Sequence, residues 1–236
     1  MIVKHFINKK EVALNIAQEV FLKMSHQGVT RIAISGGSTP KLLFEILSTA
    51  PFKNNIRWEN IHLFWVDERC VSPDDAESNY GMVAKTLLRH IVIPIENIHR
   101  IRGEAEDISA EAKRCSEEVL ANSKTNRQSS TLFDVALMGM GEDGHTASIF
   151  PDQMYLLNSK KIYEISRHPQ SGQSRIGLTG EAILNSNKII FMITGNEKKD
   201  LLMQVLSDPT STDRYPAANI MYKAKDLEIY TDIAVG

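Results

Sequence analysis

Short apolar runs recur along the chain and alternate with segments of helical periodicity. Four runs are rich in β-branched or aromatic residues: TRIAIS (30–35), IHLFWV (61–66), FDVALM (133–138) and KIIFMIT (188–194). Nearly continuous apolar runs are typical of strands that are covered on both faces, as in parallel sheets. We therefore predict four buried strands, each followed by a polar or glycine-bearing loop.

Helical patterns occupy the segments between these runs. Val12, Ile16 and Val20 recur four positions apart and form one apolar stripe, which predicts a helix over 11–24. Further helices are predicted at 40–47, 107–121 and 196–206. Strands that alternate with helices indicate βαβ units. The chain is therefore predicted to form a doubly wound, mainly parallel α/β sheet with helices on both faces.

One polar segment interrupts this pattern. NSKTNRQSS (122–130) lacks large apolar residues, so we predict a loop there. This loop could mark a domain boundary, but the strand predicted at 133–138 needs partners from the first half of the chain. We therefore predict a single domain over residues 1–236.

Composition narrows the classes of function. Of the 236 residues, 42% are hydrophobic and 24% are charged, and the net charge is −2. These values are ordinary for a globular protein and argue against nucleic acid or an anionic membrane as the main partner. The two cysteines imply no disulfide framework and fit a reducing compartment. Since no signal-peptide core or membrane-length apolar run is present, a cytoplasmic location is expected.

The loop SGGSTP follows the first predicted strand. Ligands of open α/β sheets bind beyond the carboxyl ends of the strands, so this loop is a candidate binding element. Gly36 and Gly37 allow a close approach of the backbone to a ligand, and Ser38 or Thr39 can cap the next helix. The free N–H groups of a helix N-terminus attract phosphate. A plain strand-to-helix turn is the alternative.

VDER places three charged side chains at the end of the second strand. Asp67, Glu68 and Arg69 could form part of a site, but a surface cluster of salt bridges is the common alternative. The neighbouring Cys70 could be a reactive thiol if Arg69 lowers its pKa. We favour a packing role for this cysteine.

The loop GMGEDGH contains the pattern G-x-G-x-x-G (139–144), which resembles a dinucleotide-binding fingerprint. Glu164 even lies where a ribose-binding carboxylate is expected. However, Asp143 would meet the pyrophosphate with like charge, and the following segment contains Pro151 and no clean helical stripe. The βαβ unit that the fingerprint requires is therefore missing, and dinucleotide binding is disfavoured.

His145 lies two residues after Asp143 in the same loop. A histidine beside a carboxylate can be a general base with an orienting partner, whereas an exposed loop histidine is the alternative. The other six histidines lack such company and are predicted to be structural or surface residues. Arg175 in RIGLT and Lys198 in GNEK add cations that could meet an anion. Neither a cluster of metal ligands nor a G-x-S-x-G elbow is found in the sequence.

Taken together, these motifs resemble those of the 6-phosphogluconolactonases. SGGSTP, VDER, SNY (78–80), GMGEDGHTASIFP, RIGLT and GNEK occur in this order. The chain is also similar to the broader superfamily that includes glucosamine-6-phosphate deaminases. The resemblance implies a Rossmann-like three-layer fold without NAD. It also implies hydrolysis of 6-phospho-D-glucono-1,5-lactone to 6-phosphogluconate, the second step of the oxidative pentose phosphate pathway.

The resemblance further implies roles for particular residues. His145 would activate water, Asp143 would assist it, and Arg69 would lie near the substrate. The residues expected to bind substrate or phosphate are Gly36, Gly37, Ser38, Thr39, Asp67, Arg175 and Lys198. No cofactor and no metal are expected. The expected partner is a small sugar-phosphate lactone, and the expected assembly is a monomer or a small homo-oligomer.

Two alternatives stay open: a glucosamine-6-phosphate deaminase-isomerase and a non-catalytic sugar-phosphate sensor. The deaminases carry a glutamate just before the proline that follows their DGH turn, where this chain has Phe150. They also commonly have an aromatic residue at the position of Arg69. The presence of both His145 and Asp143 argues against a sensor. One departure from the lactonases is Gly177, where that family usually has threonine.

Overall fold

Seven strands form the central sheet of the computed structural model, which describes residues 1–126 and 129–235. Their order is β1-β12-β11-β8-β2-β3-β5, and every neighbouring pair is parallel. The strands are β1 (Ile2–His5), β2 (Thr30–Ile34), β3 (Ile61–Trp65), β5 (Ile98–His99), β8 (Phe133–Met138), β11 (Ser186–Ile193) and β12 (Leu227–Thr231). The four strands predicted from apolar runs are confirmed as β2, β3, β8 and β11.

The strand order reverses between β2 and β8. The chain runs from β2 outward through β3 to β5, and then returns to β8 on the other side of β2. All six residues of β8 are buried, as expected for a strand covered on both faces. A reversal of this kind opens a crevice at the carboxyl ends of the two central strands.

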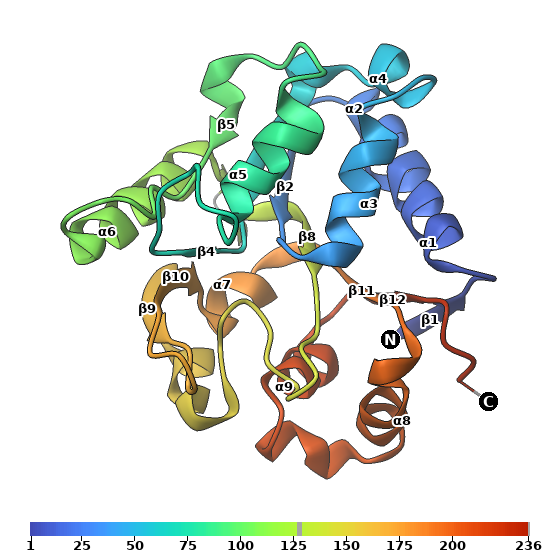
Figure 1. Ribbon diagram of the computed structural model, residues 1–236, viewed down its shortest axis with the longest axis vertical. Helices are drawn as coiled ribbons and strands as arrows, with labels where there is room; N and C mark the ends of the chain where they lie inside the picture. Colours follow the sequence, from blue (N-terminus) through green and yellow to red (C-terminus); the bar gives the residue numbers. More distant parts are fainter. Residues whose placement is uncertain (127–128, 236) are drawn as a thin grey trace.

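Helices cover both faces of the sheet. Figure 1 shows α1, α3 and α5 on one side and α7, α8 and α9 on the other, which confirms the doubly wound arrangement. The helices are α1 (Lys9–Ile16), α2 (Lys23–Ser25), α3 (Ser38–Leu47), α4 (Phe52–Asn55), α5 (Asn79–Val83), α6 (Ile108–Asn122), α7 (Gly180–Leu184), α8 (Lys199–Ser207) and α9 (Pro216–Lys223). None of the described helices is both long and apolar enough to cross a membrane.

The helix predicted over 11–24 is confirmed with one irregularity. α1 continues into a π-helical segment, Ala17–Leu22, before α2. Asn8 precedes α1, and its side chain accepts hydrogen bonds from the backbone N–H groups of Lys10 and Glu11. This cap satisfies two donors that a helix N-terminus otherwise leaves free.

A second sheet, which the sequence analysis did not predict, stands beside the first. Its three antiparallel strands are β4 (Asp67–Arg69), β10 (Ser174–Leu178) and β9 (Tyr163–Arg167), in the order β4-β10-β9. The pairing places Asp67 opposite Gly177 and Arg69 opposite Arg175. The motifs VDER and RIGLT are thus neighbouring strands, although about a hundred residues separate them in the chain.

The prediction of a loop over 122–130 is wrong for part of that segment. β6 (Lys124–Asn126) and β7 (Ser129–Thr131) pair as antiparallel strands, and residues 127–128 lie outside the described residues. Backbone hydrogen bonds form an antiparallel pair without any requirement for large apolar side chains. The absence of such side chains therefore did not exclude strands.

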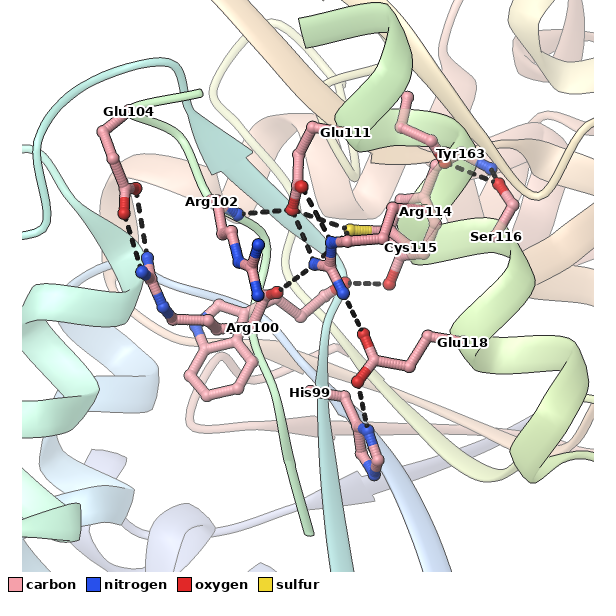
Figure 2. Close-up of polar contacts among 12 residues, drawn as sticks. His99, Arg100, Arg102, Glu104, Glu111, Arg114, Cys115, Ser116, Glu118 and Tyr163 are labelled. Atoms are coloured by element: carbon pink, nitrogen blue, oxygen red, sulfur yellow. Dashed lines mark hydrogen bonds and ion pairs between the residues drawn. The ribbon is translucent and has the colours of Figure 1, made fainter. Parts of the chain in front are cut away.

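A polar network joins α6 to strand β5 and to the segment that follows it (Figure 2). His99 on β5 lies 2.9 Å from a carboxylate oxygen of Glu118, and Arg114 forms ion pairs with both Glu118 and Glu111. Glu111 also accepts a hydrogen bond from the backbone N–H of Arg102. These contacts confirm the predicted structural role of His99. They hold β5, an edge strand of the central sheet, against α6.

Candidate active site

A cavity of about 210 Å³ lies at the carboxyl ends of the central strands. Its walls come from the loops after β2, β3, β8 and β11, together with β10 of the second sheet. Among the residues expected from the sequence, those that line it are Gly36, Gly37, Ser38, Thr39, Asp67, Arg69, His145, Arg175 and Lys198. The structure therefore brings together motifs that are spread over more than 160 residues of sequence.

The N-terminus of α3 faces this cavity. Gly37 precedes the helix with φ of 104°, a conformation that favours glycine, and no side chain caps the helix. The prediction that Ser38 or Thr39 caps it is therefore wrong: Ser38 is already the first helical residue, and the Thr39 hydroxyl lies 2.9 Å from that of Thr194. Because no side chain takes the first N–H groups, they remain available to an anionic ligand.

The loop after β8 presents His145 and Asp143 as a hydrogen-bonded pair. Nδ1 of His145 lies 2.6 Å from Oδ1 of Asp143. Burial alone would raise the pKa of Asp143, but the hydrogen bonds from His145 outweigh this effect and hold that pKa below its usual value. A Cβ atom at Gly141 would lie 2.2 Å from His145 Nδ1. Glycine at this position thus makes room for the imidazole ring.

Phe150 packs against two of the site residues. Its side chain is fully buried. The ring of His145 lies 4.9 Å from the Phe150 ring, and the guanidinium carbon of Arg175 lies 5.9 Å from that ring centre. One aromatic side chain therefore packs near both the imidazole and the guanidinium.

Two arginines enter the cavity side by side. Arg69 and Arg175 are directly opposite on β4 and β10, and the Nε of each is buried without a partner among the described residues. Burial and, after it, the charge of Arg69 lower the pKa of Arg175. Like charges placed directly opposite are unfavourable in a sheet. An anion bound in the cavity would relieve this repulsion.

Glu68 organises the wall beside these arginines. Its buried carboxylate accepts hydrogen bonds from the N–H groups of Arg69, Asn79 and Tyr80 and from the hydroxyl of Ser78. Burial nevertheless raises the pKa of Glu68. Through these hydrogen bonds, the carboxylate of Glu68 holds the motif SNY beside the motif VDER.

Asn79 and Ser148 are among the residues that line the cavity but were not predicted from the sequence as site residues. Asn79 and Ser148 each donate a hydrogen bond to Asp67, Asn79 to the backbone oxygen at 2.9 Å and Ser148 to the side chain. Asn79 lies within the motif SNY and Ser148 within GMGEDGHTASIFP, but neither residue was given a role. Asp143 is not itself part of the cavity wall and reaches the site through His145.

Cys70 is a partly buried thiol beside the site rather than in its wall. Burial, with the charge of Glu68 as a further cause, raises the pKa of Cys70 to about 11. The thiol is therefore protonated at neutral pH, and a protonated thiol is a poor nucleophile. This agrees with the packing role favoured from the sequence.

The arrangement offers a general base and a cationic anion site within one cavity. Within the described part of the chain, no group of three His, Cys, Asp or Glu side chains could hold a metal ion. Since Asp143 occupies Nδ1 of His145, the other ring nitrogen is the one available for proton transfer. The cavity thus brings an imidazole and two guanidinium groups to the same space.

Fold and site together define a doubly wound α/β protein with a histidine–carboxylate pair in a cationic cavity at the strand-order reversal. Residues 8–229 match the family described as glucosamine-6-phosphate isomerases/6-phosphogluconolactonase, and the chain belongs to this family. It is 44% identical over 219 residues to the 6-phosphogluconolactonase of Haemophilus influenzae, covering 93% of this chain and 91% of that protein.

Solved structures agree with this assignment. The chain is similar to the crystal structure of 6-phosphogluconolactonase from Thermotoga maritima, with a TM-score of 0.79, 25% identity and coverage of 97% and 96% of the two chains. It also resembles a monomeric glucosamine-6-phosphate deaminase, with a TM-score of 0.80, 18% identity and coverage of 98% and 97%. At that identity the second likeness shows the fold alone.

Proposed function

We propose that the chain hydrolyses 6-phospho-D-glucono-1,5-lactone to 6-phosphogluconate. The observation that carries the proposal is the His145–Asp143 pair in the same cavity as two arginines with unpartnered donors. The likeness to the 6-phosphogluconolactonases of Haemophilus influenzae and Thermotoga maritima supports it. The chain is proposed to act as one domain, in keeping with the family match over residues 8–229.

In the proposed reaction, His145 takes a proton from a water molecule that attacks the lactone carbonyl. Asp143 accepts the Nδ1–H of His145, which leaves the other ring nitrogen with a free lone pair and stabilises the imidazolium that forms. The attack places negative charge on the carbonyl oxygen, and Arg69 is the proposed donor to it. Collapse of this intermediate breaks the ring ester bond, and His145 returns its proton to the departing ring oxygen.

The phosphate of the substrate is proposed to lie against the N-terminus of α3. The N–H groups of Gly37, Ser38 and Thr39 and the side chains of Arg175 and Lys198 are its expected partners. Contacts to the phosphate hold the lactone carbonyl carbon near His145. This positioning does not depend on contacts to the reacting atoms themselves. The carboxylates of the loop after β8 then need not meet the phosphate.

The same site is poorly suited to deamination of glucosamine 6-phosphate. Deaminases carry a glutamate at the position of Phe150 for ring opening and proton transfer. Phenylalanine has no ionisable group and cannot replace it. The guanidinium of Arg69 is a cation, so it favours a developing oxyanion over a developing ammonium group. A sensor would have no need of the His145–Asp143 pair.

Parallel assays of freshly generated lactone and of glucosamine 6-phosphate test the proposal. Expected are 6-phosphogluconate formation well above the spontaneous rate and no ammonia release at high enzyme concentration. Gluconolactone without the phosphate is the matched substrate control and should react much more slowly at low concentration. Enzyme-dependent ammonia release that is lost in His145→Ala would overturn the assignment in favour of a deaminase.

A further inference from the structure

The residues after His145 form a tight turn of unusual backbone conformation. Ala147 and Ser148 have φ of 53° and 59°, in the left-handed region that glycine or asparagine usually occupies. Thr146 and Ile149 flank them: the N–H of Ile149 donates to the oxygen of Thr146 at 2.7 Å, and the N–H of Thr146 donates back at 3.3 Å. Such strained turns persist only where the surroundings hold them in place.

Asp67 is the side chain that holds this turn from the second sheet. The buried hydroxyl of Ser148 donates to Oδ2 of Asp67. Nδ2 of Asn79 lies 3.4 Å from the other oxygen, Oδ1, and donates to the backbone oxygen of Asp67 at 2.9 Å. The carboxylate of Asp67 is therefore engaged by groups of the protein itself.

Gly177 lies directly against the same turn. It lies opposite Asp67 in the β4–β10 pair. A Cβ atom at this position would lie 2.4 Å from the backbone oxygen of Ala147 and 3.3 Å from the Cβ of Asp67. The turn at 146–149 thus packs directly on the second sheet. Any other residue type at position 177 would place its Cβ atom too close to the turn for this packing.

The turn also connects the two supports of the imidazole. Thr146 follows His145 directly, and its hydroxyl donates to the backbone oxygen of Gly139 at 2.7 Å. Ile149 leads into Phe150, on whose ring His145 lies. A displacement of the turn would therefore move the imidazole, whereas the N-terminus of α3 belongs to a different element.

We propose that Asp67 is a positioning residue, which with Gly177 fixes the 146–149 turn and thereby the His145 imidazole. This rests on the proposed function, in which His145 activates water. In the sequence analysis, Asp67 was expected among the residues that bind substrate or phosphate. A carboxylate repels a phosphate, however, and both of its oxygens already face donors of the protein, so the positioning role replaces that expectation.

The test compares Asp67→Ala, Asp67→Asn, Ser148→Ala and the double variant Asp67→Ala/Ser148→Ala. The readouts are kcat, KM, the affinity for 6-phosphogluconate and the hydrogen-exchange rates of the Thr146 and Ile149 amides. Asp213→Ala, a change of an exposed aspartate away from the cavity, is the matched control and should leave all four unchanged.

Asp67→Ala is expected to lower kcat by roughly tenfold or more, which corresponds to losing one charge-assisted hydrogen bond. Affinity for 6-phosphogluconate should stay within about twofold, and exchange of the two amides should accelerate. Asp67→Asn keeps an oxygen that can accept from Ser148 and should recover most of the loss. Because both partners serve one contact, the double variant should be little worse than either single variant.

Three results would overturn the positioning role. One is a loss of 6-phosphogluconate affinity in Asp67→Ala as large as the loss of kcat/KM, which would mean direct ligand contact. Another is an Asp67→Asn variant as impaired as Asp67→Ala, and the third is unchanged exchange at Thr146 and Ile149. A wild-type protein without lactonase activity would refute the proposed function instead, while the exchange rates would still decide whether Asp67 holds the turn.

Discussion

Arg69 and Arg175 lie directly opposite one another on adjacent antiparallel strands, and both side chains line the same cavity. Each keeps a buried Nε without a partner among the described residues. Two like charges in register cost stability unless an anion lies between them. An anion that binds in the cavity should therefore stabilise the protein.

Sulfate or phosphate should accordingly raise the melting temperature of the protein. At an anion concentration one hundred times the Kd, the gain is about 2.7 kcal/mol, or roughly 5–10 °C for a chain of this size. Arg175→Ala should abolish most of the shift and weaken 6-phosphogluconate binding. Arg167→Ala, at an exposed position on β9, is the control and should keep the shift. An equal shift in Arg175→Ala would remove Arg175 from the anion site.

Asp143→Asn should lower kcat by roughly ten- to a hundredfold with little change in KM. The substitution removes the charge-assisted hydrogen bond to His145, which contributes about 1.5–3 kcal/mol. Because the pKa of Asp143 is held below its usual value, the carboxylate is ionised throughout the neutral range. A variant that keeps the kcat of the wild type at neutral pH would contradict the assignment.

Cys70 should react slowly with thiol reagents at neutral pH. Its pKa is raised to about 11, so the thiolate is the minor form below that pH. The rate of labelling should rise with pH up to about 11, as stopped-flow measurements with a disulfide reagent can show. Rapid labelling at pH 7 that also inhibits turnover would mean that the thiol takes part in the site after all.

Arg114→Met should destabilise the protein and leave kcat intact, because Arg114 lies outside the cavity. Its loss leaves the buried carboxylate of Glu111 without its ion-pair partner. Removing one member of a buried pair costs 3–5 kcal/mol. Since about a third of the Arg114 side chain is exposed, about 2–3 kcal/mol is expected from chemical denaturation.

This loss should depend on pH in a defined direction. Burial alone would raise the pKa of Glu111, but hydrogen bonds from Arg114 and from the Arg102 N–H hold it below its ordinary value of 4.5. A lowered pKa adds stability above pH 4.5, and this stability is lost as the pH falls through the folded value. The difference between wild type and Arg114→Met should therefore narrow below about pH 4.5. A difference that is constant with pH would contradict this account of the pair.

The four middle strands of the central sheet, β11, β8, β2 and β3, were predictable because they are apolar on both faces. The run at 133–138, for example, has a length and composition that few other structures accommodate. The second sheet was not predictable, since Asp67–Arg69 is short and polar and pairs with a strand about a hundred residues away. Its pairing depends on tertiary contacts, and local sequence patterns do not report those.

The site was predictable where one loop holds its own chemistry, as with Asp143 and His145. The role of Phe150 beneath His145 and Arg175 came only from the structure, although the sequence marked that position by its lack of a carboxylate. Ser148 lies within the motif GMGEDGHTASIFP, but the motif did not single out its hydroxyl. Its hydrogen bond to Asp67 exists because the turn places it there in a conformation that few serines adopt.

The turnover of His145→Ala tests the central claim most directly. A general base contributes about 10²–10⁴ in rate, or roughly 3–5 kcal/mol of barrier. With freshly generated lactone and correction for spontaneous hydrolysis, kcat should fall by that factor. The melting temperature and the affinity for 6-phosphogluconate should stay close to those of the wild type. A His145→Ala protein that folds normally and keeps near wild-type turnover would show that His145 does not activate the water.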